Sequence, residues 1–178
     1  MGFFDKFKKK KEEDPDIDIT LPKLKVGYMV DYDLKTWEVS EYNKYDWGDH
    51  VYSYEWELKS GNELFYLEQD DDEDETEWML VQKVPFRSID PGLGKYIQEH
   101  DDPPEELTYN GVQYYLEDNG GGYFCRGGGK EGAEFLYWDY IDKSEELIIS
   151  LEQWSEERFE ASVGKYVEEY EFTNILPR

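Results

Sequence analysis

The chain has 178 residues, a length that suits one medium-sized domain or two small halves that share a core. Its 44 acidic and 19 basic residues give a net charge of −25, and the resulting field repels nucleic acids and anionic lipids. Aromatic residues make up 17% of the chain, which excludes an intrinsically disordered acidic protein. We therefore expect a folded protein that does not bind nucleic acid directly, and the high charge also serves solubility.

Residues 1–23 differ from the rest of the chain and read as a basic, aromatic tail followed by a linker. Residues 1–11 contain five lysines and one aspartate, and a weak interfacial anchor combines such lysines with aromatic rings. The residues expected to contact a membrane are Phe3, Phe4, Phe7, Lys8, Lys9, Lys10 and Lys11. A frayed tail in solution is the alternative. Because neither a signal peptide nor an apolar run of ~20 residues is visible, we expect a cytoplasmic protein. If the tail acts as an anchor, the protein would lie at the inner face of the membrane.

From Leu24 onward, apolar and polar residues alternate as they do in half-buried strands. In the segment 52–59, every even position is aromatic or aliphatic and every odd position is polar. Turn residues at 60–62 lead into a further strand over 63–69, and Asn110-Gly111 is a strong hairpin signal. About ten such strands at regular spacing predict an all-β sandwich or barrel.

Two parts of the chain resemble each other. Residues 54–58, a turn and residues 63–69 have counterparts in residues 136–140, a turn and residues 146–153. The repetition predicts two antiparallel β units of about five strands each, which form a sandwich or partly open barrels packed as one domain. We place this duplicated domain at 24–176, with a first unit at 24–90, a connection at 91–104 and a second unit at 105–176.

The order of these segments resembles an uncharacterised bacterial family, domain of unknown function 4178, from about Leu24 to Leu176. The resemblance is carried by residues 24–32, 56–58 and 67–68 in the first half, and by residues 109–111, 114, 137–140, 151–154 and 160–165 in the second. It implies no catalytic residues, because the family has no assigned activity. Its members look like β-rich cytoplasmic modules that occur alongside membrane-associated and envelope-stress proteins. The acidic insert after Gln69 departs from the family's pattern.

Several segments contain residue types that bind metals or phosphate, but their spacing does not fit such sites. The acidic run 70–75 lacks the glycine and the bidentate acid of an EF-hand, so we expect a solvated connection with at most weak divalent-cation binding. The triglycines 120–122 and 127–129 lack the spacing of a P-loop and are expected to form hairpin turns. Cys125 has no disulfide partner in the chain, and neither His50 nor His100 lies in a cysteine-hydrolase context. We therefore expect no catalytic residue, no cofactor and no metal.

The aromatic residues divide into expected core and expected surface positions. Trp56 and Trp138 lie on the apolar face of alternating strands, which favours the core. Aromatic residues dominate binding hot spots, and we expect a surface aromatic patch formed by Tyr45, Trp47, Tyr52 and Trp154.

The sequence thus predicts a non-enzymatic, acidic β module that acts in protein interaction, next to the membrane if the tail binds there. It does not identify the protein partner. Two alternatives stay open. One is an inhibitor that mimics a polyanion and occupies a basic, DNA-binding protein. The other is a small-molecule binder or enzyme with a pocket between the two halves.

Overall fold

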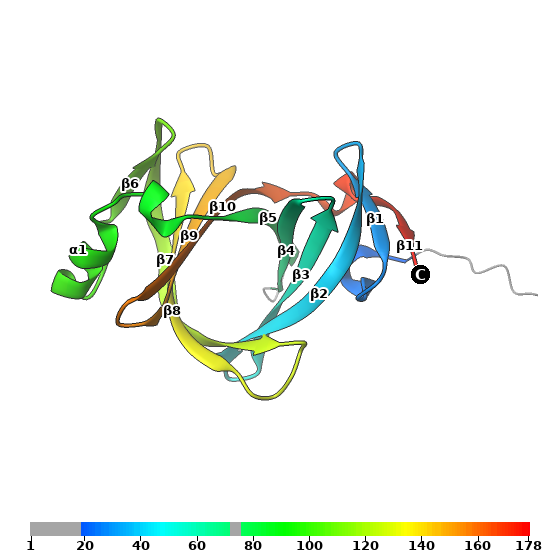
Figure 1. Ribbon diagram of the computed structural model, residues 1–178, viewed down its shortest axis with the longest axis horizontal. Helices are drawn as coiled ribbons and strands as arrows, with labels where there is room; N and C mark the ends of the chain where they lie inside the picture. Colours follow the sequence, from blue (N-terminus) through cyan, green and yellow to red (C-terminus); the bar gives the residue numbers. More distant parts are fainter. Residues whose placement is uncertain (1–18, 72–75) are drawn as a thin grey trace, which may run out of the picture.

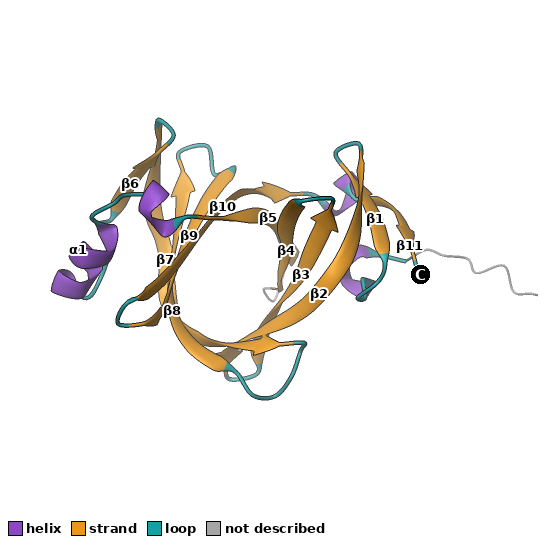
Figure 2. Cartoon of the chain, viewed as in Figure 1, coloured by secondary structure: helices purple, strands orange, loops and turns teal. Residues whose placement is uncertain are grey.

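The computed structural model describes residues 19–71 and 76–178, and the predicted membrane contacts of the tail lie outside this part of the chain. In the described residues, eleven strands form one antiparallel sheet (Figure 2). The strands are β1 (Met29–Tyr32), β2 (Lys35–Gly48), β3 (Val51–Ser60), β4 (Glu63–Asp71), β5 (Thr76–Val84), β6 (Glu106–Tyr109), β7 (Val112–Arg126), β8 (Ala133–Asp142), β9 (Leu147–Ser155), β10 (Arg158–Val167) and β11 (Thr173–Leu176). The helical elements are α1 (Leu93–His100) and the 3-10 turns η1 (Leu21–Lys23), η2 (Phe86–Ser88) and η3 (Glu169–Glu171).

The sheet closes into a barrel because β2 and β7 pair with each other. The strand order around the barrel is β2-β3-β4-β5-β10-β9-β8-β7, and residues 43–46 of β2 pair with residues 123–126 of β7. These two strands are 14 and 15 residues long, so each also pairs at its start with a short outer strand, β1 or β6. Figure 1 shows the resulting ring, with β6 and α1 on one side and β1 and β11 on the other.

A first hydrophobic core lies on the outer face of the barrel wall. Strand alternation sends Trp56 of β3 and Leu67 of β4 outward, where Leu21 of η1 and Leu24 pack with them. Trp56 is 2% exposed, and its Nε1 donates a hydrogen bond to the backbone oxygen of Leu24 at 3.1 Å. Burial of each such side chain stabilises the fold by about 1.5–3 kcal/mol, so the segment before β1 belongs to the folded unit.

A second core lies on the outer face of the other half. Trp138 and Tyr140 of β8 pack with Leu93 and Ile97 of α1. Trp138 is 3% exposed, and the Tyr140 hydroxyl donates a hydrogen bond to the backbone oxygen of Pro104 at 2.8 Å. The connection between the halves therefore covers this core, and the prediction that Trp56 and Trp138 are core residues is confirmed.

The all-β prediction is confirmed, and the sheet forms one closed barrel rather than a sandwich or partly open barrels. The closure has a physical reason: β5 pairs with β10 and β2 pairs with β7, so the two halves share one sheet on both sides. The duplication of two β units and the domain bounds stay predictions. The predicted turn at 120–122 is wrong, because these glycines lie inside β7. Among the described residues, no helix has the length and apolar character needed to cross a membrane.

Candidate functional site: a cavity inside the barrel

The inner face of the barrel wall carries acidic side chains. Leu67, Trp138 and Leu151 point outward into the two cores. Because side chains alternate along a strand, the residue after each of them points into the barrel. These three inward residues are Glu68 of β4, Asp139 of β8 and Glu152 of β9, and all three line one cavity.

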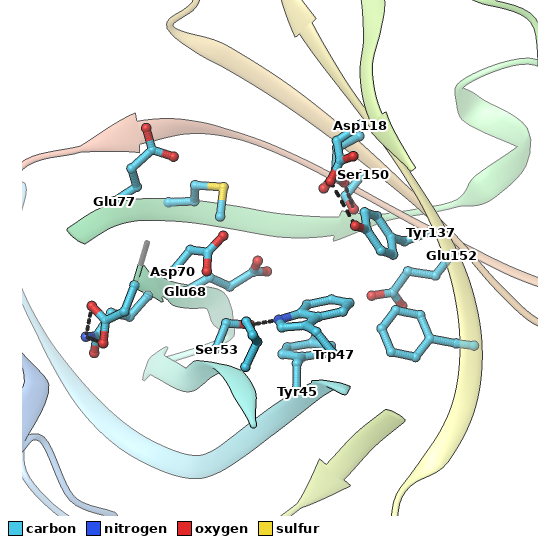
Figure 3. Close-up of a pocket in the computed structure, with 16 residues that line it drawn as sticks. Tyr45, Trp47, Ser53, Glu68, Asp70, Glu77, Asp118, Tyr137, Ser150 and Glu152 are labelled. Carbon is cyan, nitrogen blue, oxygen red and sulfur yellow. Dashed lines mark hydrogen bonds between the residues drawn. The ribbon is translucent and has the colours of Figure 1, made fainter. Parts of the chain in front are cut away.

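The cavity has a volume of about 480 Å³, within the range of roughly 300–1,000 Å³ that small-molecule sites occupy (Figure 3). Its acidic residues are Glu68, Asp70, Asp71, Glu77, Asp118, Asp139 and Glu152. Its aromatic residues are Tyr45, Trp47, Phe135 and Tyr137. Among the described residues, no lysine or arginine lines this cavity. A strongly negative, partly aromatic chamber therefore lies at one end of the barrel interior.

The aromatic residues form a connected wall of the cavity. The rings of Tyr45 and Trp47 stack with their centroids 5.5 Å apart and an interplanar angle of 5°. Trp47 also meets Tyr137 at 5.1 Å and Phe135 at 5.8 Å, both edge to face. The Nε1 atom of Trp47 donates a hydrogen bond to Ser53 Oγ at 3.0 Å, which fixes the orientation of the indole (Figure 3).

Two glycines of β7 make room for this wall. A Cβ atom on Gly122 would lie 2.7 Å from a ring carbon of Trp47, and one on Gly120 would lie 3.1 Å from the ring of Tyr137. Glycine inside a strand often marks such a close approach. Gly120 and Gly122 thus lie within β7 and against two rings of the cavity wall.

Glu68 of β4 is an acidic residue that faces the cavity. It keeps some accessible surface because it faces the cavity, but it lies deep in the barrel. Burial is the largest cause that raises its pKa well above the usual range, and the charges of Glu55 and Glu152 add to this effect. Within the described part of the chain, no hydrogen bond or ion pair involves Glu68. Its oxygens are therefore available to a ligand that donates hydrogen bonds.

The pKa values of Asp139 and Glu152 are raised for the same physical reason, burial. Burial raises the pKa of Asp139 to about 6, although a hydrogen bond from Ser150 Oγ favours the ionised form. Burial raises the pKa of Glu152 to about 7, against the attraction of Lys83. Near neutral pH these carboxyl groups are therefore close to their titration midpoints, and a bound cation would favour their ionised forms.

Buried polar side chains lie next to the cavity. Glu55 is 4% exposed and accepts hydrogen bonds from Asn43 Nδ2 at 2.8 Å and from the Tyr45 hydroxyl at 3.0 Å. Lys83 lines a small neighbouring space together with Glu55, Glu68 and Glu152, and its ammonium pairs with Glu160 at 2.8 Å. The far end holds a second space of about 370 Å³, whose basic residues are Lys83, Arg126 and Arg158. The barrel interior is thus acidic at one end and of mixed charge at the other.

The structure brings together three of the four residues predicted to form a surface patch. Tyr45 and Trp47 line the acidic cavity, and Tyr45 is only 8% exposed. Trp154 lies at the far end, where its ring stacks on Phe135 at 4.9 Å. These rings therefore face the barrel interior. Tyr52 is separate from them, with the Lys44 ammonium 4.5 Å from its ring centroid.

Sequence reasoning missed the acidic residues that carry the site. The signal was present: Glu68, Asp139 and Glu152 each follow a large apolar residue on a predicted strand. Alternation alone marks these positions as polar, and a polar strand face usually contacts solvent. Only the closure of the barrel turns that face inward.

The acidic residues do not converge as metal ligands do. Within residues 19–71 and 76–178, no group of three or more His, Cys, Asp or Glu side chains is placed to hold a metal ion. Of the acidic run 70–75, residues 72–75 lie outside the described residues. The described carboxylates are instead distributed around the cavity, an arrangement that suits an extended ligand better than a point charge.

Comparison with known proteins places the chain in a family without an assigned function. A relative from Aquifex aeolicus (strain VF5), described as an uncharacterized protein, is 29% identical over 184 residues, with both chains covered completely. No solved structure matches the chain. The family model described as domain of unknown function (DUF4178) matches residues 25–169, and the chain therefore belongs to the DUF4178 family.

Proposed function

We propose that the protein binds a small organic cation inside the barrel. The observation that carries this proposal is the wall of the 480 Å³ cavity, which combines acidic residues and aromatic rings and, among the described residues, has no lysine or arginine. Ligand sites are concave, are partly apolar and contain a few placed polar groups. A cation is the ligand whose charge matches this wall.

The electrostatics of the cavity wall support a cationic ligand. Several carboxylates share a partly desolvated space, and such charges are costly unless an opposite charge compensates them. Lys83 attracts Glu68 and Glu152 from the small neighbouring space, but its own ammonium is paired with Glu160. A bound cation would add a positive charge on the cavity side of Glu68.

The aromatic wall supports the same ligand class. Cations are attracted to the faces of Trp and Tyr rings by about 0.5–2 kcal/mol, and more when the site excludes water. Trp47 and Tyr137 contribute two such rings to the cavity (Figure 3). Their position beside carboxylates favours an organic cation with an apolar part over a hydrated inorganic ion.

Isothermal titration calorimetry with the full chain tests this function. The probes are choline, butylamine and spermidine, with glycerol and succinate as neutral and anionic comparators. We expect one-to-one binding of at least one cation and no binding of the comparators. The Asp139→Asn variant should bind this cation at least tenfold more weakly, whereas Glu134→Gln, an exposed acid on the same strand, should change affinity less than twofold. Absence of cation binding, or equal effects of the two variants, would reject the proposal.

Interaction with a protein partner is a second candidate function, and one observation favours it. Leu34, in the turn between β1 and β2, is fully exposed at 103% of its reference area. Surface turns often carry binding residues, and this hairpin tip can reach a partner, here at the inner face of the membrane if the basic tail anchors the protein. Co-sedimentation with anionic and neutral liposomes tests the anchor: deletion of residues 1–11 should abolish binding to anionic lipid, and equal behaviour of both chains would reject it.

We also propose that the two halves derive from one duplicated β unit. Each half has a short strand, a long strand and three further strands in the same order, β1 to β5 and β6 to β10. Glu68 and Glu152 follow Leu67 and Leu151 at corresponding positions, and both line the cavity. In an experimental structure, β2–β5 should superimpose on β7–β10, and a failure to superimpose in sequence order would contradict the duplication.

A further inference from the structure

The distribution of acceptors in the cavity narrows the class of cation. We propose that the ligand is an aliphatic oligoamine, a flexible chain with at least two ammonium groups that carry N–H donors. This inference rests on the proposed cation-binding function. It follows from three features of the cavity: open hydrogen-bond acceptors, carboxylates at two depths, and apolar surface in the same chamber.

Open acceptors favour a cation with N–H groups. Glu68 accepts no hydrogen bond within the described residues, Asp139 accepts one from Ser150, and Glu152 accepts one from Trp154 Nε1. An ionised carboxylate has two oxygens and about four acceptor positions, so most of this capacity is unused. A quaternary ammonium ion has no N–H donor and leaves these acceptors unsatisfied, whereas a primary ammonium supplies three donors.

The carboxylates lie at two depths, which favours more than one ammonium group. Asp70 of β4 and Glu77 of β5 are exposed, occupy opposite positions in the strand register and lie at the mouth of the cavity. Glu68 lies two residues deeper along β4, a rise of about 7 Å. Two nitrogens joined by four methylene groups are about 6 Å apart at bond lengths near 1.5 Å. One oligoamine can therefore reach the mouth and the deep carboxylates together.

Apolar surface lies in the same chamber as these acids. Met79 of β5, Trp47 and Phe135 line the cavity together with Glu68 and Asp139. Methylene groups between two nitrogens would contact these side chains, and the burial of their apolar surface favours binding. A single divalent metal ion fits less well, because no set of three acidic, His or Cys residues among those described is placed around one point.

Calorimetry with a graded set of amines tests this inference. Butylamine, 1,4-diaminobutane and spermidine are titrated into the full chain, with tetramethylammonium and MgCl2 as cations of other geometry. Affinity should rise at least tenfold from butylamine to spermidine at one-to-one stoichiometry, since each added charge-assisted hydrogen bond strengthens binding by roughly tenfold or more. Excess MgCl2 should not displace spermidine beyond the effect of NaCl at equal ionic strength.

Variants locate the binding and separate the two proposals. Glu68→Gln should weaken spermidine binding at least tenfold, and Glu134→Gln, on the outer surface, less than twofold; urea unfolding confirms that both variants are folded. If tetramethylammonium binds as tightly as spermidine, the oligoamine inference is overturned while cation binding stands. If spermidine binds but Glu68→Gln has no effect, its binding is to the outer surface and the inference also fails. If no cation binds, both proposals fall.

Discussion

The substitution Asp139→Asn should make the empty protein more stable while it weakens ligand binding. Asp139 faces the cavity, and burial raises its pKa to about 6. The ionised form is therefore disfavoured in the folded state, and its cost in stability begins as the pH rises above the ordinary value of 3.8 and is fully present above about 6. Asparagine has no charge, and its side-chain oxygen can still accept the hydrogen bond from Ser150.

The magnitude follows from the two pKa values. The pKa is about 6 in the folded protein and 3.8 for an ordinary aspartate, and each pH unit of difference is worth about 1.36 kcal/mol. At pH 8 the ionised Asp139 therefore destabilises the fold by about 3 kcal/mol, and at pH 5 by about half of that. Below about pH 3.8 the carboxyl is protonated in both states, so the cost disappears.

Urea unfolding of the two proteins at pH 5 and pH 8 measures this effect. We expect Asp139→Asn to raise the free energy of unfolding by about 1–3 kcal/mol at pH 8, and by a smaller amount at pH 5. The surface variant Glu134→Gln should stay within about 0.5 kcal/mol of the parent protein at both values. A destabilised Asp139→Asn variant, or a gain that does not depend on pH, would refute the reasoning that an uncompensated buried charge occupies the cavity.

Three further predictions follow from the barrel interior. Gly122→Ala places a Cβ atom 2.7 Å from the Trp47 ring, so it should destabilise the protein by about 1–3 kcal/mol and shift the tryptophan fluorescence. Gly94→Ala is the control, because a Cβ atom there makes only ordinary contacts and should not destabilise the protein. Equal stabilities of the two variants would contradict the close approach. Tyr45→Phe removes the hydroxyl that donates to buried Glu55 and should lower the free energy of unfolding by about 1–3 kcal/mol in urea; an unchanged value would mean that this hydrogen bond is not formed. Cation binding should release protons from Asp139 and Glu152, because burial raises their pKa values to about 6 and about 7. Calorimetry should therefore show weaker cation binding at pH 5.5 than at pH 8. An affinity that does not depend on pH would show that these groups do not contact the ligand.

Local patterns in the sequence predict most of the strands. The alternation over 52–59 corresponds to β3 (Val51–Ser60), and the expected strand 63–69 corresponds to β4 (Glu63–Asp71). The burial of Trp56 and Trp138 follows from the same alternation. Strand pairing between distant segments, such as β2 with β7, leaves no comparable local signature, because many antiparallel registers have similar side-chain patterns. Barrel closure therefore could not be derived from local patterns.

The candidate site depends on that closure, and this explains what sequence reasoning missed. By strand alternation alone, Glu68 and Asp139 are predicted to face solvent. In the closed barrel, the same sheet face lines the interior. Gly122 resembles a turn residue because glycine is common in turns, and only the nearby ring of Trp47 shows why it lies in a strand. Tyr45 and Trp47 are expected on the surface as candidate binding residues, whereas in the structure the two rings stack and line the cavity.

A crystal structure of the full chain grown with spermidine would show where the ligand binds. We expect one spermidine molecule inside the barrel, with nitrogens within hydrogen-bond distance of Glu68 and Asp139 and methylene groups against Trp47. Spermidine confined to the outer surface, with only water in the cavity, would contradict this expectation.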